Sequence, residues 1–386
     1  MTMPPRNNAV YDIKLTLADC KPTLYIVSSK SFQYYYLIIF RFVIRTVQIR
    51  MKTENKKKFK TLLLIVGCAI FFVLIYKVGP STIYHQLIVL KWRVLLLLLP
   101  FSLVFIFDTL GWKYAFTSSK ISFKDLFLIR LAGESLNWII PSANFAGEPM
   151  KAYFLKKHNV PMVDGMTSVV VSKTILIISQ IVFVMIGVAF LLFKLNVSGT
   201  RLISSIAIIL LGVPIIMFIV FAQKQGLFAF LLKLLRLFRI RIRYIEEREE
   251  KLLELDKNIY QFYSHNKKKA FYSFGYCFLG YMAGLIEAFM ILYFLDIPID
   301  SVSIYIIESL ATVAKGVTSF IPGSVGGQEG GIIAIFMSLK LGAGVALTFG
   351  ILRRFRELVW TGAGLLVLSK LEWSMADATP LEGDNH

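Results

Sequence analysis

Cysteine is scarce in this chain, and acidic residues are far outnumbered by basic ones. The three cysteines, Cys20, Cys68 and Cys277, lie far apart and form no CxxC pair and no Cys/His group with metal-ligand spacing. We therefore expect neither a disulfide framework nor a zinc site. The sequence also lacks a Gly-rich nucleotide-binding loop, which argues against direct use of ATP.

Charged residues of either sign are sparse, at 17% of 386 residues, whereas a soluble domain carries about 25%. Hydrophobic residues make up 56%, and the mean hydropathy is +0.66. They are concentrated in blocks of roughly 18–25 residues, long enough to cross the hydrocarbon layer of a bilayer. This pattern excludes a soluble enzyme, a disordered chain and a collagen-like fibre. Because the blocks are continuous rather than alternating, it also argues against an outer-membrane barrel.

The basic excess is large, since 43 Lys and Arg against 24 Asp and Glu give a net charge of +19. These residues lie between the apolar blocks, where they set topology and contact anionic lipid headgroups. We therefore expect membrane lipids as partners and no nucleic acid. Residues 52–60, 113–160 and 223–269 are rich in Lys and Arg and are predicted to be cytoplasmic, whereas the 194–201 and 296–300 links are predicted to face outward.

The apolar blocks predict an all-α, polytopic membrane protein with about six full spans. The spans cover residues 61–79, 93–112, 165–193, 202–222, 271–295 and 342–370. Residues 81–92 are predicted to form a short interfacial helix, since Trp92 suits the headgroup level. A cleaved signal peptide is the alternative for residues 51–79, but no small-x-small cleavage site follows them.

Three regions follow from this pattern. Residues 1–57 are predicted to be a cytoplasmic N-terminal extension, in which Met51, opening MKTENKKKFK before an apolar run, looks like a natural start. Residues 58–370 form the transmembrane domain, which includes the basic cytoplasmic loop 223–269. Residues 371–386 form a short polar tail.

Two apolar regions, residues 134–148 and 315–329, are interrupted by proline, glycine and charge. Aligned on Pro141 and Pro322, both have a charged residue seven positions before the proline and a glutamate seven positions after it. Proline cannot continue a helix, so each region is predicted to be a re-entrant half-helix, turn and half-helix. Three predicted spans separate the motifs; an odd number inverts the second motif, as in an inverted repeat with a site at the midplane. A chance match of two Pro/Gly loops is the alternative.

The polar residues of these regions recur at helical spacing. One stripe contains Arg130, Glu134 and Asn137, and the other contains Glu308, Thr312, Lys315 and Ser319. A charge at the centre of a lipid-facing helix costs about 2.5–3.5 kcal/mol. Both stripes are therefore expected to face inward and to meet in one wet pocket near the two prolines. Structural ion pairs, for example between Glu134 and Lys315, are the alternative.

Further charges interrupt the later spans. They are Lys173, Glu287, Arg353, Arg354, Arg356 and Glu357. Such residues are candidates for substrate contact, and an Arg353–Glu357 ion pair is the structural alternative for the last group. Asp108, near a span end, is expected at the interface. The glycine-rich residues 323–327 precede a helix, and free backbone N–H groups there suit a phosphate.

Together, these features resemble the lysylphosphatidylglycerol-synthase transmembrane-region family of flippase-like membrane proteins. The resemblance runs from about Lys58 to Lys370 and rests on Glu134, Asn137, Pro141, Gly147 and Glu148 followed by KAYFL, on Pro322, Gly323, Gly326 and Glu329, and on Arg353 or Arg354. Lys173 stands where the family has an arginine, and residues 142–146 are less glycine-rich than the usual first motif. The resemblance implies an inner-membrane fold with re-entrant helices. In bifunctional members this region is fused to a soluble aminoacyl-transferase domain; no such domain is expected here, so we expect no lysyl-lipid synthesis.

The combined evidence predicts a multi-pass protein of the inner (plasma) membrane that translocates a phospholipid or lipid-linked headgroup between leaflets. The candidate substrate-binding residues are Glu134, Asn137, Glu148, Lys173, Lys315, Gly323, Gly326, Glu329, Arg353 and Arg354. The glutamates would contact cationic or hydroxyl groups, while the basic side chains and the glycine-rich backbone would hold phosphate. No catalytic residue, metal or cofactor is predicted. A membrane-embedded transferase and a small-solute secondary transporter are the alternatives, and a homo-oligomer or a separate lipid-modifying enzyme are the expected protein partners.

Overall fold

The computed structural model describes residues 91–117, 119–140, 144–195, 200–237, 249–319, 324 and 326–377, and their regular elements are all helices. In chain order these are α4 (Arg93–Leu96), α5 (Leu98–Tyr114), α6 (Phe123–Ile139), α7 (Gly147–Leu155), the 3₁₀ helix η1 (Lys156–His158), α8 (Met162–Leu195), α9 (Thr200–Gln225), α10 (Leu227–Leu237), α12 (Glu249–His265), α13 (Lys267–Phe294), α14 (Ser301–Thr318), α15 (Gly327–Ser338) and α16 (Ala343–Asp377). The all-α prediction is confirmed for this part of the chain. The predicted first span and the N-terminal extension lie outside it, as do all but the last two residues of the predicted interfacial helix.

Three stretches of the described chain are long and apolar enough to cross a bilayer: Arg93–Tyr114, Met162–Lys194 and Lys267–Phe294. They coincide with three predicted spans to within a few residues. Helices α9 and α16 cover two further predicted spans, and their crossing of a membrane stays a prediction.

The first of these stretches is divided between α4 and α5. Pro100 has no backbone N–H, and its ring crowds the carbonyl group four residues earlier, at Leu96. Helix α4 ends at Leu96. The division therefore follows from the position of the proline.

In each Pro/Gly region one helix ends and a second one begins, since α6 is followed by α7 and α14 is followed by α15. Their re-entry into a membrane stays a prediction. Helix α6 ends at Ile139, and Ile140 has extended backbone (φ −90°, ψ 123°), which is the conformation favoured before a proline such as Pro141. In the turns, Asn144 and Ser324 adopt positive φ values of 64° and 52°. Left-handed backbone of this kind lets the chain reverse and start a second helix nearby.

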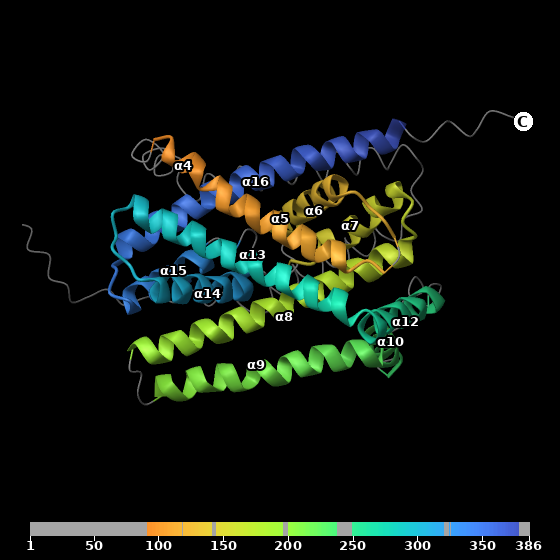
Figure 1. The fold of residues 1–386 in the computed structure, drawn as a ribbon, viewed down its shortest axis with the longest axis horizontal. Coiled ribbons are helices and arrows are strands. Elements are labelled where there is room, and N and C mark those ends of the chain that lie inside the picture. Colours follow the sequence, from red (N-terminus) through yellow and green to blue (C-terminus); the bar gives the residue numbers. More distant parts are fainter. Residues whose placement is uncertain are drawn as a thin grey trace, which may run out of the picture. The chain divides into compact units, whose positions relative to one another are not determined.

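The helices of the two halves make corresponding contacts. Helix α5 packs against α13, α6 packs against α16, and α14 packs against α8. Figure 1 shows the α6–α7 pair and the α14–α15 pair toward opposite ends of α13. If α5 is exchanged with α13, α6 with α14 and α8 with α16, the contact between α6 and α16 becomes the contact between α14 and α8. The contact between α5 and α13 is then converted into itself.

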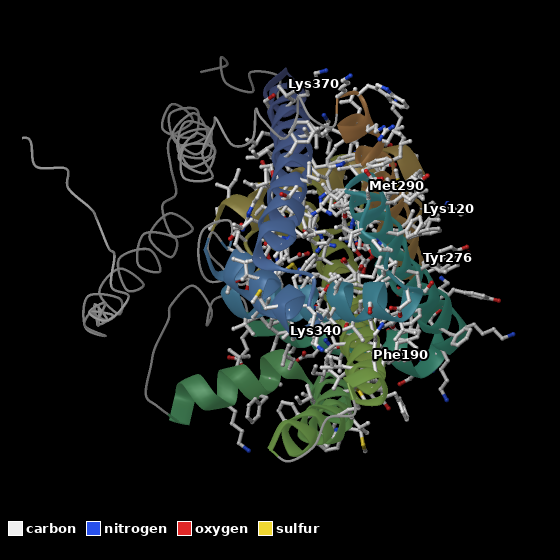
Figure 2. All side chains as sticks on the ribbon, turned by 90° about the vertical axis from the view of Figure 1, so that its left-hand side faces the viewer. Lys120, Phe190, Tyr276, Met290, Lys340 and Lys370 are labelled. Carbon is white, nitrogen blue, oxygen red and sulfur yellow. The ribbon has the colours of Figure 1, made fainter. Side chains whose placement is uncertain are left out.

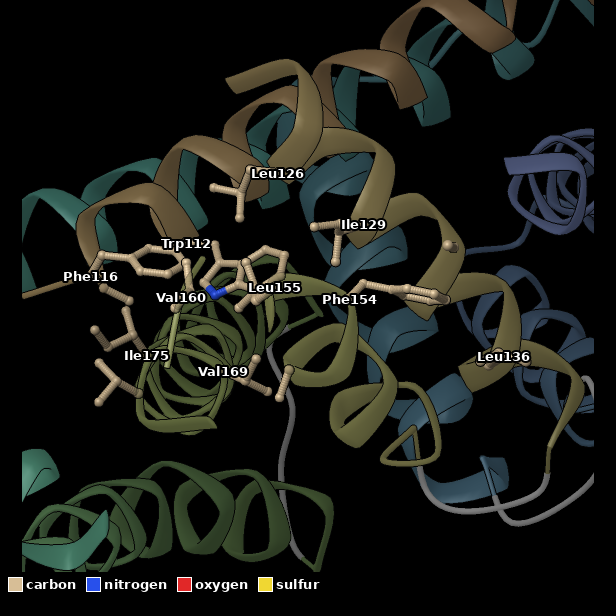
Figure 3. Packing of buried hydrophobic residues seen from close by; sticks show 14 of the residues in the cluster. Trp112, Phe116, Leu126, Ile129, Leu136, Phe154, Leu155, Val160, Val169 and Ile175 are labelled. Carbon is tan, nitrogen blue, oxygen red and sulfur yellow. The ribbon is translucent and has the colours of Figure 1, made fainter. Parts of the chain in front are cut away.

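We call the α6–α7 pair and the α14–α15 pair the two broken helices. Each of them contributes to a separate apolar core. One core surrounds α6 and α7 and contains the fully buried Trp112 and Phe154 (Figure 3). The other surrounds α14 and α15 and contains Phe336 and Phe349, whose ring centroids are 5.1 Å apart. Side chains fill the space between the ribbons, while Lys120 and Lys370 lie at the periphery (Figure 2). Between helices in lipid, close packing of this kind replaces the hydrophobic effect as the stabilising interaction.

Candidate functional site

The amide of Asn137 organises the junction between α6 and α7. Its Oδ1 accepts a hydrogen bond from the backbone N–H of Gly147 (2.6 Å), and its Nδ2 donates to Glu134 (3.3 Å) and Glu148 (3.1 Å). The side chain is buried. One amide therefore satisfies the start of α7 and orients two carboxylates.

Lys151 lies at the centre of this first network. Its Nζ is 2.6 Å from Glu134 Oε1 and 3.2 Å from both carboxylate oxygens of Glu148. The side chain is buried, so both contacts are screened little by water. Lys151 was missing from the predicted site. Its i, i+3 spacing from Glu148 on the predicted second half-helix is the signal that could have found it.

Lys173 ties α8 to the turn between α6 and α7. Its Nζ donates to the backbone carbonyl of Asn144 (2.8 Å) and lies 3.1 Å from Glu148 Oε1. We call this group of Asn144, Glu148 and Lys173 the first latch. It holds the turn, the start of α7 and a long helix together through one ammonium group.

Arg130 extends the first network toward α5. Its Nη2 lies 2.7 Å from Asp108 Oδ2 and 3.9 Å from Glu134 Oε1. The Asp108 side chain is only 13% exposed. Asp108 therefore lies inside the bundle, where Arg130 compensates its charge. Its predicted depth at the membrane interface stays a prediction.

Arg354 of α16 occupies the equivalent place in the second half. Its Nε lies 2.6 Å from Glu329 Oε1, and its Nη2 donates to the backbone carbonyl of Ser324 (3.1 Å). The other oxygen of Glu329 accepts a hydrogen bond from the backbone N–H of Gly326 (2.7 Å), which has φ +84°. We call Ser324, Glu329 and Arg354 the second latch. The glycine-rich turn thus has an N–H group aimed at an anion, and in this conformation the anion is Glu329.

The second network also contains Glu357, which pairs with Lys315 (2.6 Å) and Arg354 (2.9 Å) and lies 3.4 Å from Arg356. The ion pair suggested between Glu134 and Lys315 is wrong, since Lys315 is held by Glu357 on a different helix.

Arg353 and Arg356 complete the second network from α16. Arg353 pairs with Glu308 of α14, and Arg356 pairs with Glu287 of α13. The alternative of an Arg353–Glu357 pair within one helix is therefore wrong. Successive side chains of α16 point to different neighbours, so each arginine reaches a carboxylate across a helix interface.

The two networks meet at Trp138. Lys315 Nζ lies 5.1 Å from the centroid of the Trp138 ring, a distance at which a cation is attracted to an aromatic face. The sequence predicted one shared pocket, whereas the structure has two networks separated by aromatic side chains. Phe105 and Trp360 stack in the same region at a centroid distance of 5.0 Å.

The predicted site residues divide accordingly. Glu134, Asn137, Glu148 and Lys173 are in the first network, and Lys315, Glu329, Arg353 and Arg354 are in the second, with Gly326 at its turn. Gly323, Pro141 and Pro322 lie outside the described residues.

The two latch cations also occupy matching positions in the sequence. Lys173 follows Pro141 by 32 residues, and Arg354 follows Pro322 by 32 residues. The alignment that matches Glu148 with Glu329 therefore also matches the two latch cations. The correspondence extends well beyond the fifteen positions in which the motifs were first recognised.

A small cavity adjoins the first latch. It is lined by Trp112, Arg130, Glu134, Glu148, Lys151, Val169, Ser172, Lys173 and Leu176, and holds about 10 Å³ of space for a water centre. That volume is about enough for one water molecule. A phosphate group enters this cavity only if the ion pairs around it separate, so this conformation is closed at the first latch.

The sequence model of the family described as lysylphosphatidylglycerol synthase TM region matches residues 61–364 of this chain. The chain belongs to the lysylphosphatidylglycerol synthase TM region family. Together with the three apolar helices, membership identifies it as an integral membrane protein.

Comparison with curated proteins and with solved structures gives no match. The family match covers both broken helices and both latches of this lysylphosphatidylglycerol synthase TM region.

Proposed function

We propose that this protein translocates a phospholipid or lipid-linked headgroup between the leaflets of the plasma membrane. The observation that carries the proposal is the pair of latches, in which a largely buried cation, a carboxylate and a turn carbonyl meet at each broken helix. Ionisable groups inside a membrane protein mark substrate pathways, because burying them without a use is costly.

The proposed architecture is an inverted repeat with about six full spans and two re-entrant helices. It is supported by the corresponding packing of the two halves and by the matched positions of Lys173 and Arg354. In such repeats, broken helices place their termini at a midplane site, and rocking of one half against the other exposes that site alternately. The headgroup would pass between the latches while its acyl chains stay in lipid.

In this proposal, Lys173 and Arg354 hold the phosphate of the headgroup, with help from the N–H of Gly326. Glu134, Glu148 and Glu329 receive its cationic or hydroxyl groups. Asn137 positions Glu134 and Glu148, and Lys315 and Arg353 hold the carboxylates of Glu357 and Glu308 in the second network. These roles require the closed pairs to open during transport.

Reconstitution in proteoliposomes tests this function. Fluorescent phospholipids in the outer leaflet are bleached by a membrane-impermeant reductant, and translocation appears as bleaching of the inner pool. We expect the wild-type protein to move at least one lipid, and Lys173→Met with Arg354→Met to abolish the movement in folded protein. Rates equal to those of protein-free vesicles across anionic and zwitterionic lipids would reject the proposal.

A further inference from the structure

The first and second networks, which contain the two latches, each carry no net charge within the described residues. The first contains three cations (Arg130, Lys151 and Lys173) and three carboxylates (Asp108, Glu134 and Glu148). The second contains four cations (Lys315, Arg353, Arg354 and Arg356) and four carboxylates (Glu287, Glu308, Glu329 and Glu357). The short undescribed turns, residues 141–143, 320–323 and 325, contain no ionisable side chain in the sequence.

This balance constrains what each latch can accept. The carboxylate of Glu148 or Glu329 already occupies the anion position beside its cation. An incoming phosphate must displace it from that cation. The displaced Glu148 still contacts Lys151, and the displaced Glu329 still accepts a hydrogen bond from Gly326, but the network then holds one more anion than it has cations. Leaving one member of a buried pair unpaired is strongly destabilising. A purely anionic headgroup therefore leaves a previously neutral network with an uncompensated negative charge.

A headgroup that carries both charges avoids this problem. Its phosphate replaces the glutamate on Lys173 or Arg354, and its ammonium pairs with the glutamate that has been displaced. The second latch already presents the N–H of Gly326 and the guanidinium of Arg354 to one anion. The exchange keeps the number of buried ion pairs constant or raises it, and it leaves the network neutral.

We propose that the two latches select a zwitterionic headgroup, one with a phosphate and an ammonium group, by exchange with the Lys173–Glu148 and Arg354–Glu329 pairs. This inference rests on the proposed function and names its substrate class. Because the latches are matched in position, the same exchange operates at both, and Glu148 and Glu329 are its specificity-determining residues.

The test compares two fluorescent lipids in the same proteoliposomes, zwitterionic phosphatidylethanolamine and anionic phosphatidylglycerol. We expect the wild-type protein to move phosphatidylethanolamine at least about tenfold faster, a ratio equivalent to about 1.4 kcal/mol. In the Glu148→Gln, Glu329→Gln double variant each latch keeps its cation but loses its carboxylate, so the preference should shift toward phosphatidylglycerol by a similar factor. Asp300→Asn, the same chemical change outside both networks, should leave the ratio unchanged.

Binding in detergent separates this inference from the transport function. Short-chain phosphatidylethanolamine should raise the melting temperature of the wild-type protein more than short-chain phosphatidylglycerol does, and the double variant should reverse the order. This result without translocation would reject the proposed function and retain the headgroup selectivity. Translocation of both lipids at equal rates, faster translocation of phosphatidylglycerol, or a ratio that the double variant does not change would overturn the selectivity and leave the transport function standing.

Discussion

At the scale of single residues, the stability of this fold depends on buried ion pairs. Arg356 and Glu287 have side chains that are 6% and 1% exposed. At such burial, removing one partner costs far more than the pair itself contributes, because the remaining charge loses both water and counter-ion. By contrast, Lys194 and Asp300 pair at a surface where Asp300 is 53% exposed.

We predict that Arg356→Met lowers the free energy of unfolding by about 3–5 kcal/mol, because it leaves the Glu287 carboxylate buried and unpaired. Adding Glu287→Leu should recover much of the loss. Lys194→Met should cost less than about 1 kcal/mol. Thermal unfolding of the purified variants in detergent measures all three. Equal losses for Arg356→Met and Lys194→Met would contradict the burial argument.

Gly147 lies where α6 and α7 approach so closely that a larger side chain has no room. A Cβ atom at this position would lie 1.9 Å from the backbone oxygen of Gly133, whereas one at Gly275 would meet nothing within 4 Å. We predict that Gly147→Ala yields little folded protein, because α6 and α7 must separate. Gly275→Ala should be neutral or stabilise α13 by up to about 1 kcal/mol. Size-exclusion profiles of solubilised protein compare the two, and a normal profile for Gly147→Ala would show that the junction can relax.

At the scale of elements, each broken helix is defined by how it starts and stops. The carboxylate of Asp300 accepts a hydrogen bond from the backbone N–H of Ser303 (3.1 Å) and so caps α14. Lys194, at the end of α8, donates to the same carboxylate. This one residue therefore joins a helix start to a neighbouring helix end, at the outward-facing link predicted from the charge pattern.

The pH dependence of Asp300 is predictable in sign. The hydrogen bond from Lys194, followed by those from Ser303, lowers the pKa of Asp300 from its ordinary value of 3.8 to about 2. Its contribution to stability is therefore complete above pH 3.8 and is lost as the pH falls toward 2. We predict that Asp300→Asn lowers stability by less than about 1 kcal/mol at neutral pH, since the group is exposed. Melting curves of both proteins should converge near pH 2, and a constant difference across this range would exclude Asp300 as the titrating group.

At the scale of the whole molecule, the inverted repeat makes a prediction about sidedness. The link after α7 is expected on the cytoplasmic side and the link after α15 on the outer side, because in the proposed inverted repeat the two broken helices enter from opposite faces. Both Lys157 and Lys340, which lie in these links, are exposed.

We predict that a membrane-impermeant maleimide labels Lys340→Cys from outside and Lys157→Cys only in inverted vesicles. The parent for both variants has its three native cysteines replaced. Labelling of both positions from the same side would mean that the motifs are parallel and would remove the basis for alternating access.

Several features of this protein are determined by its sequence alone. Apolar blocks predict the long helices because a bilayer requires spans of that length, and Pro141 and Pro322 predict the broken helices because proline cannot donate a backbone hydrogen bond. The family resemblance follows from the same residues. Glu134, Glu148, Lys173 and Arg354 could be predicted to face the interior of the bundle because charge inside an apolar block has to face inward.

Only the tertiary structure decided which charges pair. Helical spacing gives the face on which a residue lies, but not the neighbouring helix that this face meets. Lys315 therefore pairs with Glu357 rather than with Glu134, and Arg353 reaches Glu308 across an interface. The first network depends on the packing of α5 against α6 and of α7 against α8, and the second depends on the packing of α13 and α15 against α16.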